Sequence, residues 1–367
     1  MPEVRLLEIT KRYGDVVAAD RVTIEIGDRE YVTFLGPSGC GKTTILKIVA
    51  GILRQDEGDV YIGNRLVNDV PTEDRGVGYV FQNIVLFPHM NVWDNVTYGP
   101  RVRAWDLSKT RKLAQEMLEM VRLNVRSNAH PQELSGGMQQ KTAVSRALTS
   151  GADLLLLDEP FASLDAHVRR ELRQEVRRLI KDLGLTAIHV THDQEEAMTI
   201  SDRIVVMKKG RVLEEGKPRE LYLKPATIFT ANFLGEANFM EGKIANVHGG
   251  LSEVEVAGNL TMKVQNASFG VGESVVLAVR PEFVSVEKGE RHGVNTVLGR
   301  ITEIESMGWQ VRREIRLDNE NMVVSTAASD EAGRFSTGSR VTIKITPENL
   351  LLYSYPKEGL RAALALE

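Results

Sequence analysis

The sequence has almost no cysteine and no long apolar run. Its 367 residues include a single cysteine, Cys40, so no disulfide can form within the chain. That composition suits a reducing compartment such as the cytosol. The densest apolar run, Leu154 to Leu157, has the length of a strand, whereas a membrane-spanning helix needs about 20 apolar residues. No apolar signal core follows the first residues. We therefore expect the chain to serve a membrane only by docking on other subunits.

The chain also lacks an excess of charge of either sign. Lysine and arginine number 46, aspartate and glutamate number 50, and the net charge is −4. Such a balance gives no general attraction to nucleic acid or to an anionic membrane. The length is enough for two domains of ordinary size, and the apolar content of 42% permits a sizeable core.

Two regions differ in their patterns. Residues 1–236 alternate strand-like and helix-like segments, which is typical of an α/β domain. The predicted strands are 22–26, 31–35, 77–81, 154–157, 187–190 and 203–207, and the predicted helices are 108–122, 137–149 and 166–183. Residues 237–367 contain short strands and turns with almost no helical periodicity. This pattern predicts a second, all-β domain, of barrel type.

The second region contains an internal repeat. Phe269, Gly272, Val275, Leu277, Val279, Pro281 and Glu282 recur as Phe335, Gly338, Val341, Ile343, Ile345, Pro347 and Glu348, always 66 positions later. Each copy has the pattern of a turn, a strand and a Pro-Glu break. We expect two similar β-units packed together.

Residues 36–44 fit the phosphate-binding pattern G-x-x-x-x-G-K-[ST], between a predicted strand and a predicted helix. Glycines let backbone N–H groups turn inward around an anion, and the helix N-terminus adds its positive end. Lys42 can reach the β- and γ-phosphates, and the Thr43 hydroxyl is placed for Mg²⁺. The alternative is a plain glycine-rich turn. The predicted ATP-binding residues of this loop are Pro37, Ser38, Gly39, Cys40, Gly41, Lys42, Thr43 and Thr44.

Two carboxylates, Asp158 and Glu159, directly follow the leucine run. A central parallel strand is buried on both faces and so is continuously apolar. Ligands bind at the carboxyl end of such strands. We expect Asp158 to hold Mg²⁺ and Glu159 to polarise the attacking water. Without the phosphate loop, a solvated acidic turn would be the simpler interpretation.

Ser135, Gly136 and Gly137 open the predicted helix 137–149. Exposed N–H groups there make a second anion-binding helix N-terminus. One nucleotide does not need two such sites from one chain, but two chains facing head to tail could use both. Ser135 and Gly137 would then close on the γ-phosphate held by the partner chain. The alternative is an ordinary serine N-cap.

Taken in order, these motifs resemble those of ABC transporter ATPases. The resemblance rests on residues 36–43, Gln82, 134–140, 157–160, 163–165 and His192. Residues 81–90 and 191–198 are similar to the importer subfamily. The tail resembles the regulatory domain of the maltose, polyamine, ferric-iron and sulfate importer ATPases. Met138, Gln139 and Lys141 depart from the maltose type, which usually has Gln, Arg and Arg there.

The resemblance implies an α/β P-loop NTPase domain of the ABC type over 1–236 and an OB-like regulatory domain over 237–367. It implies that Tyr13 stacks on adenine, that Gln82 senses Mg²⁺ and the attacking water, and that His192 contacts the γ-phosphate. Asp165 would belong to a loop crossing the dimer interface. The implied catalytic residues are Glu159, His192 and Gln82; the implied metal site is Thr43, Gln82 and Asp158; and the implied contacts to the partner's ATP are Ser135, Gly136, Gly137 and Asp165.

The implied protein is the ATP-hydrolysing subunit of an importer at the cytoplasmic face of the membrane. It would form a homodimer, bind ATP and Mg²⁺, and dock on two integral-membrane permease subunits, with a periplasmic or extracellular solute-binding protein as an indirect partner. A soluble ABC ATPase that contacts nucleic acid is the alternative, but there is one ATPase module, no long coiled-coil insertion and no basic face. The substrate stays open between a polyamine, an inorganic ion and a sugar, and Phe87 slightly favours the first two.

Overall fold

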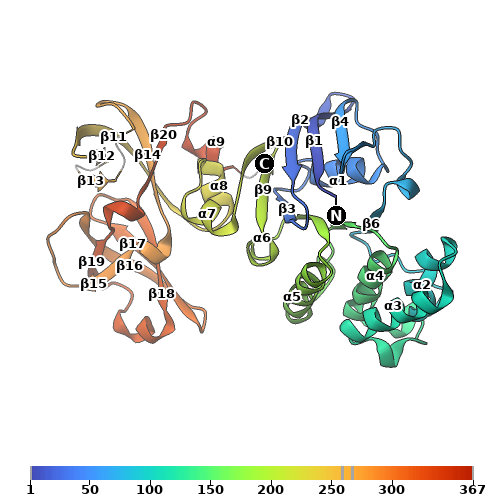
Figure 1. Cartoon of the computed structure of the whole chain (residues 1–367). Helices are drawn as coiled ribbons and strands as arrows, with labels where there is room; N and C mark the ends of the chain where they lie inside the picture. Colours follow the sequence, from blue (N-terminus) through green and yellow to red (C-terminus); the bar gives the residue numbers. More distant parts are fainter. Residues whose placement is uncertain (1, 258–259, 266–267, 366–367) are drawn as a thin grey trace. The chain divides into compact units, whose positions relative to one another are not determined.

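The chain divides into two units, which we describe separately. The computed structural model describes residues 2–257, 260–265 and 268–365. Contacts within the chain separate residues Met1–Glu220 from Leu221–Glu367 (Figure 1). The sequence predicts the boundary 16 residues later, after residue 236, so residues 221–236 are where the two divisions differ.

A six-stranded sheet runs through the first unit. Its order is β10–β9–β3–β8–β7–β6, and all neighbours are parallel except β9 and β10, which form an antiparallel hairpin. The bounds are β3 (Tyr31–Leu35), β6 (Val77–Val80), β7 (Leu154–Asp158), β8 (Thr186–Thr191), β9 (Arg203–Lys208) and β10 (Arg211–Gly216). Leu154 and Leu156 pack into one core, and Leu155 and Leu157 into another. Burial on both faces thus accounts for the leucine run.

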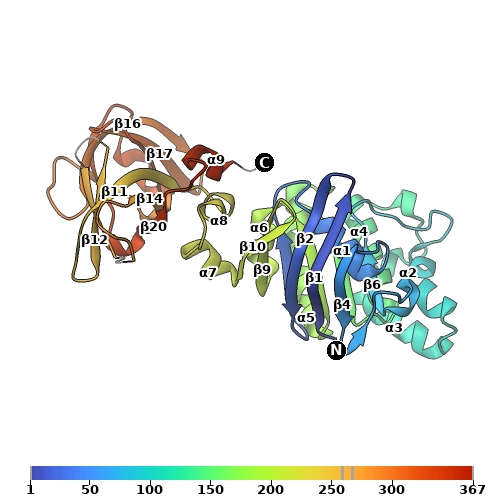
Figure 2. The ribbon, with the colours of Figure 1, turned by 90° about the horizontal axis from the view of Figure 1, so that it is seen from above.

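A smaller antiparallel sheet covers one side of this unit, with the order β2–β1–β4–β5. Its strands are β1 (Val4–Tyr13), β2 (Val16–Ile26), β4 (Glu57–Ile62) and β5 (Arg65–Leu66). Helix α1 (Lys42–Ala50) contacts β2 of this sheet and β7 and β8 of the larger one (Figures 1 and 2). Ile45, Leu46, Ile48 and Val49 of α1 are buried in the core shared by both sheets, which fixes the start of the helix relative to the strand ends.

Helices cover the other face of the large sheet. They are α2 (Val92–Val102), α3 (Leu107–Met120), α4 (Gly136–Thr149) and α5 (Ala166–Asp182), and α6 (Gln194–Ile200) follows β8. Their apolar side chains share one core with Leu155 and Leu157. Short 3-10 turns lie at Thr72–Asp74, Asn124–Arg126 and Pro131–Glu133.

Two five-stranded antiparallel sheets form most of the second unit, in agreement with the predicted all-β character of this region. Their orders are β13–β12–β11–β14–β20 and β15–β19–β16–β17–β18, around one shared core. The strands are β11 (Asn238–His248), β12 (Leu251–Val256), β13 (Leu260–Val264), β14 (Ser274–Val279), β15 (Ser285–Lys288), β16 (Thr296–Ser306), β17 (Gln310–Leu317), β18 (Met322–Ala328), β19 (Arg340–Lys344) and β20 (Leu351–Ser354). The 3-10 turns are Pro281–Phe283, Ser329–Arg334 and Pro347–Asn349.

Three short helices accompany these sheets: α7 (Pro218–Leu223), α8 (Ile228–Phe233) and α9 (Leu360–Leu364). Ile228 and Ala231 of α8 pack against Val276 and Ala278 of β14. The buried guanidinium of Arg280 donates to the carbonyls of Ala231 at 2.7 Å and Gly235 at 2.8 Å. Residues 221–236 are therefore held by contacts inside the second unit.

The 66-residue repeat has a structural counterpart. Gly272 and Gly338 have nearly the same positive φ, +88° and +87°, and each precedes a core strand followed by a 3-10 turn. The strands after these turns, Ser285–Lys288 and Leu351–Ser354, also differ by 66 positions (351 − 285 = 66). They are exchanged: β15 pairs with β19, and β20 pairs with β14. Each repeat thus supplies the edge strand of the other repeat's sheet.

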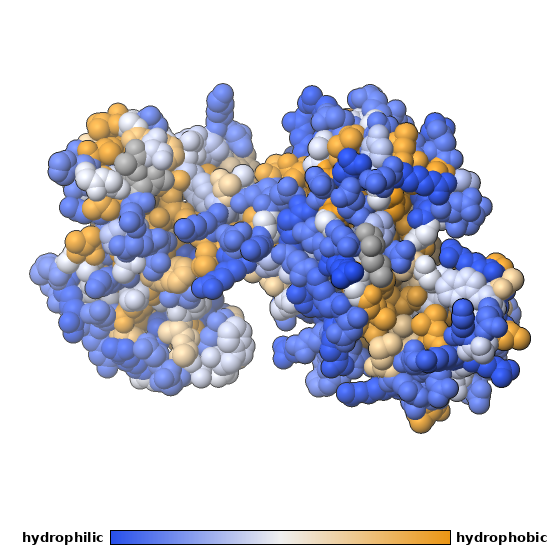
Figure 3. Space-filling model, viewed as in Figure 1, coloured by the Kyte–Doolittle hydropathy of each residue, from blue (hydrophilic) through white to orange (hydrophobic). Residues whose placement is uncertain are grey.

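The surface is mostly hydrophilic on the face shown in Figure 3, with hydrophobic patches on both units. Among the residues that the structure describes, no helix has the length and apolar content needed to cross a bilayer.

Candidate functional site

The phosphate loop, residues 36–44, joins β3 to α1. Gly41 has φ +103°, and a Cβ there would lie 1.9 Å from the Ala18 carbonyl oxygen, so only glycine fits. Gly41 also occupies the N-cap of α1, and no side chain caps this helix. The first N–H groups of α1 are therefore left for an anion.

Lys42 is buried, and its ammonium is hydrogen-bonded to the backbone of the loop. Nζ donates to the carbonyl oxygens of Gly36 at 2.7 Å and Pro37 at 2.8 Å. The Cys40 sulfur lies 3.7 Å away, and burial raises the pKa of its thiol. The loop thus holds a cation against its own backbone, and such a cation can bind a phosphate.

Asp158 ends β7 beside the first turn of α1. The Thr43 hydroxyl donates to its Oδ1 at 2.8 Å, and the Tyr79 hydroxyl donates to its Oδ2 at 2.9 Å. The carboxylate is only 4% exposed. One hydroxyl and one carboxylate suit Mg²⁺, which keeps several waters and takes phosphate oxygens as further ligands. Among the described residues no group of three or more His, Cys, Asp or Glu could hold a metal by itself.

Glu159 lies between Gln82 and His192. Its two carboxylate oxygens take one partner each: Gln82 Nε2 donates to Oε2 at 3.0 Å, and His192 Nδ1 lies 3.1 Å from Oε1. Its N–H donates to the Val190 carbonyl, and its φ is +43°, a sparsely populated conformation for this residue type. The fold therefore brings together the three residues predicted to act in catalysis, from three different segments.

Tyr13 ends β1, and its side chain is half exposed, at 51%. Lys11 Nζ lies 5.7 Å from the ring centroid. An aromatic face open to solvent suits stacking on a base.

Ser135, Gly136, Gly137 and Asp165 form a second group. Ser135 caps α4, with Oγ 3.4 Å from the Met138 N–H, and Asp165 caps α5. A Cβ on Gly137 would lie 2.7 Å from Val168 of α5, so the two helix starts lie side by side. No hydrogen bond or ion pair among the described residues joins this group to the phosphate loop. Two of the residues that depart from the maltose type make contacts outside this group. Gln139 Nε2 donates to the Pro131 carbonyl, and Lys141 pairs with Glu175 at 2.7 Å.

A buried polar network next to His192 was not predicted from the sequence. Tyr31 hydroxyl lies 3.1 Å from His189 Nδ1, and His189 Nε2 lies 2.8 Å from Glu196 Oε1. The Thr191 hydroxyl donates to the other Glu196 oxygen at 3.0 Å. This network ties β3 and β8 to α6. The available signal was the pair His189 and Thr191, at alternate positions of the buried strand β8. The contact of Tyr79 with Asp158 was not predicted either.

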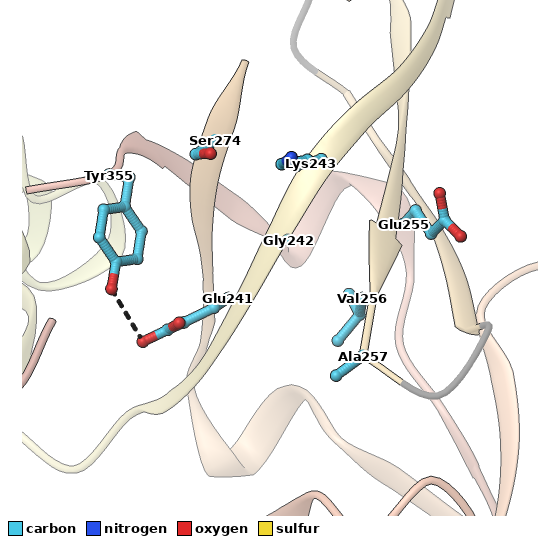
Figure 4. A pocket seen from close by; sticks show the side chains of 8 residues that line it. All are labelled: Glu241, Gly242, Lys243, Glu255, Val256, Ala257, Ser274 and Tyr355. Carbon is cyan, nitrogen blue, oxygen red and sulfur yellow. Dashed lines mark hydrogen bonds between the residues drawn. The ribbon is translucent and has the colours of Figure 1, made fainter. Parts of the chain in front are cut away.

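A pocket of about 450 Å³ lies on the second unit (Figure 4). Lys243 and two glutamates are among its lining residues, and the Tyr355 hydroxyl donates to Glu241 Oε1 at 3.3 Å. None of the predicted site residues lines it. Its position and lining do not indicate nucleotide chemistry.

Comparisons with known proteins agree with the motif order. Residues 19–162 match the ABC transporter family, and residues 277–352 match the TOBE domain family. The chain is 39% identical to a spermidine/putrescine import ATP-binding protein of Rubrobacter xylanophilus, over 93% of this chain and 90% of that protein. It is 38% identical to a maltose/maltodextrin import ATP-binding protein of Vibrio cholerae, over 96% and 95%. It is also 38% identical to an Fe(3+) ions import ATP-binding protein of Brucella abortus, over 92% and 94%.

A solved structure extends the likeness to three dimensions. The ATP-binding cassette MJ0796, a dimer in a post-hydrolysis state bound to ADP and Pi, matches with a TM-score of 0.53 and 34% identity. The match covers 59% of this chain and 99% of MJ0796.

Proposed function

This chain belongs to the import ATP-binding subunits of the ABC transporter family, and we propose that it hydrolyses ATP at sites shared by two copies of itself. ATP binding and hydrolysis for import are common to the family. The observation that carries the assignment of individual residues is the position of Thr43, Gln82, Asp158, Glu159 and His192 just past the carboxyl ends of β3, β6, β7 and β8, where hydrogen bonds join Thr43 to Asp158 and Gln82 to Glu159, and His192 lies within 3.1 Å of Glu159. Release of phosphate by the purified full chain, given ATP and Mg²⁺, is the direct test.

The chemistry is the attack of water on the γ-phosphate, in line with the leaving oxygen. Glu159 is placed to accept a hydrogen bond from that water, and Gln82 and His192 orient the carboxylate through its two oxygens. Lys42 and the N–H groups of α1 stabilise the charge on the phosphate oxygens. Mg²⁺, when bound, would neutralise β- and γ-oxygens from the Thr43 and Asp158 side.

We place the second group of residues at the partner copy's nucleotide. Ser135, Gly136, Gly137 and Asp165 present two adjacent helix N-termini. Each such terminus favours an anion. The dimeric state of MJ0796 supports this arrangement. Closing two copies head to tail would place each second group on the partner's γ-phosphate, and reopening after hydrolysis would drive the permease subunits.

Ser135→Arg tests this arrangement. We expect at least a hundredfold loss of ATP hydrolysis, because a long cation at the start of α4 would keep the partner's γ-phosphate away from the helix terminus. Nucleotide binding by the dilute monomer should stay unchanged. The measurements are phosphate release and calorimetric ATP affinity. Ser108→Arg, at the exposed start of α3, is the matched control. An equal loss of monomer binding would show that Ser135 acts within its own chain.

We propose that the permease subunits contact the region from Phe81 to Leu107, which includes Gln82. Exposed apolar side chains concentrate there: Phe81, Val85, Tyr98, Val102, Trp105 and Leu107. The segment from Phe87 to Met90 is held by hydrogen bonds. The buried Asn95 side chain accepts from the Phe87 N–H and donates to the Phe87 and Met90 carbonyls. A rigid apolar surface attached to Gln82 would link a protein contact to the catalytic carboxylate. The relatives are named for the import of polyamines, maltodextrin and iron. For this chain we propose a substrate that is a sugar, a polyamine or an inorganic ion.

Removing the second unit tests whether the first unit binds nucleotide by itself. A chain that ends at Gly216, the last residue of β10, should stay soluble and bind ATP with an affinity within about threefold of the full chain, because every predicted ATP contact within one chain lies before it. Its dimerisation without ATP should be weaker if the second units pair with each other. Calorimetry measures the ATP affinity, and gel filtration measures the dimerisation. A cut after residue 236 is a poorer design, since it would leave the apolar face of α8 without β14. Loss of ATP binding in the shorter chain would make the second unit part of the nucleotide site.

A further inference from the structure

Tyr79 is an unassigned residue that touches the proposed metal site. It lies on β6, three residues before Gln82, and its hydroxyl is 2.9 Å from Asp158 Oδ2. The other oxygen of the same carboxylate, Oδ1, takes the hydrogen bond of Thr43 at 2.8 Å. The two oxygens of Asp158 thus have one donor each.

The fold fixes Tyr79 in this position. In the parallel pair of β6 and β7, Tyr79 is the partner of Leu156, and Asp158 lies two residues further along, on the same face of the sheet. The Tyr79 ring packs against the core shared by the two sheets of the first unit, and its centroid lies 4.4 Å from that of Phe81. A ring held on two sides aims its hydroxyl at one point.

The direction of the hydrogen bond is also fixed. The Tyr79 phenol carries an O–H donor, and the Asp158 carboxylate offers acceptor oxygens, so the phenol donates and the carboxylate accepts. Thr43 and Tyr79 act as two donors to an acceptor that is nearly excluded from water, and such charge-assisted bonds are the stronger ones.

We propose that Tyr79 is a positioning residue for the magnesium ion, acting through Asp158. By holding Oδ2, it turns Oδ1 toward Thr43 and toward the place where the metal would lie. This inference rests on the proposed function, because it takes Asp158 and Thr43 as the residues that face Mg²⁺. Donors that orient metal-facing carboxylates typically change metal affinity 10- to 100-fold when they are removed.

A purely structural role for Tyr79 makes a different prediction. The ring fills space in the core, and phenylalanine would fill it equally well. If the hydroxyl has no further role, Tyr79→Phe should leave the Mg²⁺ dependence of nucleotide binding unchanged. If the hydroxyl orients Asp158, the same variant should shift that dependence and spare nucleotide binding without metal.

The experiment measures binding of the non-hydrolysable analogue AMP-PNP to the full-length chain by calorimetry, in EDTA and over a series of MgCl₂ concentrations. For Tyr79→Phe we expect the Mg²⁺ concentration at half-effect to rise about 10- to 100-fold, while the affinity in EDTA stays as in the unaltered chain. Tyr61→Phe, on β4 of the small sheet, is the matched control and should change neither quantity.

The possible outcomes distinguish a failure of the proposed metal site from a failure of the proposed role of Tyr79. An unaltered chain whose binding ignores Mg²⁺ would overturn the proposed metal site itself. An unaltered chain that responds to Mg²⁺, with Tyr79→Phe responding equally, would overturn only the role of Tyr79. If Tyr79→Phe did not fold, Tyr79→Met, which fills the space with a flexible apolar side chain and has no donor, would take its place in the same comparison.

Discussion

Replacing Glu159 by glutamine is expected to stop ATP hydrolysis and leave ATP bound. Glutamine keeps the shape of the side chain and cannot take up a proton from the attacking water, and groups in that role typically contribute 10²- to 10⁴-fold to the rate. The loss of negative charge beside the γ-phosphate should also stabilise the closed pair of chains. Phosphate release measures the first effect. Gel filtration with ATP and Mg²⁺ measures the second, as a shift from monomer to dimer.

The neighbouring acid Glu195 provides the matched control. It lies in the first turn of α6, mostly exposed, with its carboxylate 3.6 Å from Arg173. Glu195→Gln removes the same charge close to His192 and should keep normal turnover. Normal turnover in Glu159→Gln would instead remove Glu159 from the reaction and leave its contacts with Gln82 and His192 as structural ones.

Replacing Lys42 by alanine is expected to abolish tight ATP binding. A charge-assisted hydrogen bond from a buried cation to phosphate is typically worth about 1.5–3 kcal/mol, which corresponds to a loss of roughly 10- to 150-fold in affinity. The variant also removes the hydrogen bonds of the ammonium to the Gly36 and Pro37 carbonyls, whereas the buried residues of α1 keep the start of the helix in place. Calorimetry with ATP measures the loss directly.

Lys47→Ala is the control for this variant. Lys47 lies on the same helix, in its last turn, away from the phosphate loop. The Lys47→Ala substitution removes an equal charge and should leave ATP affinity within about twofold of that of the unaltered chain. An unchanged affinity in Lys42→Ala would mean that the backbone N–H groups of the loop carry the binding alone.

Local patterns in the sequence identified most of the residues that we assign to the proposed site of the first unit. The phosphate loop, the leucine strand and the serine-glycine helix start each combine a run of residue types with a fixed spacing, so a short window is enough. The residues that were missed depend on distant neighbours. The contact of Tyr79 with Asp158 joins residues 79 positions apart (158 − 79 = 79), and only the pairing of β6 with β7 creates it. The roles of the predicted residues stay predictions until the variants above are measured.

The second unit shows the same division between local and distant signals. The repeat predicted its two core strands, because turn, strand and break recur at a constant offset. The exchange of β15 and β20 could not be predicted, since short apolar strands carry no mark of which sheet they join. The contacts of residues 221–236 were missed for a similar reason: α8 has six residues, too few for a clear helical period, and its packing depends on β14.

The exchange of β15 and β20 determines which parts of the chain can fold first during synthesis. During synthesis the chain emerges from its N-terminus, and domains generally fold as they appear. All strands of the first unit have been made by residue 216, so this part can fold early on the ribosome. The sheet that begins with β11 must wait, because Val275 of β14 pairs with Ser354 of β20, 79 residues later (354 − 275 = 79). Its open edge stays exposed for that interval, and a nascent chain stalled there presents an unpaired strand to its neighbours.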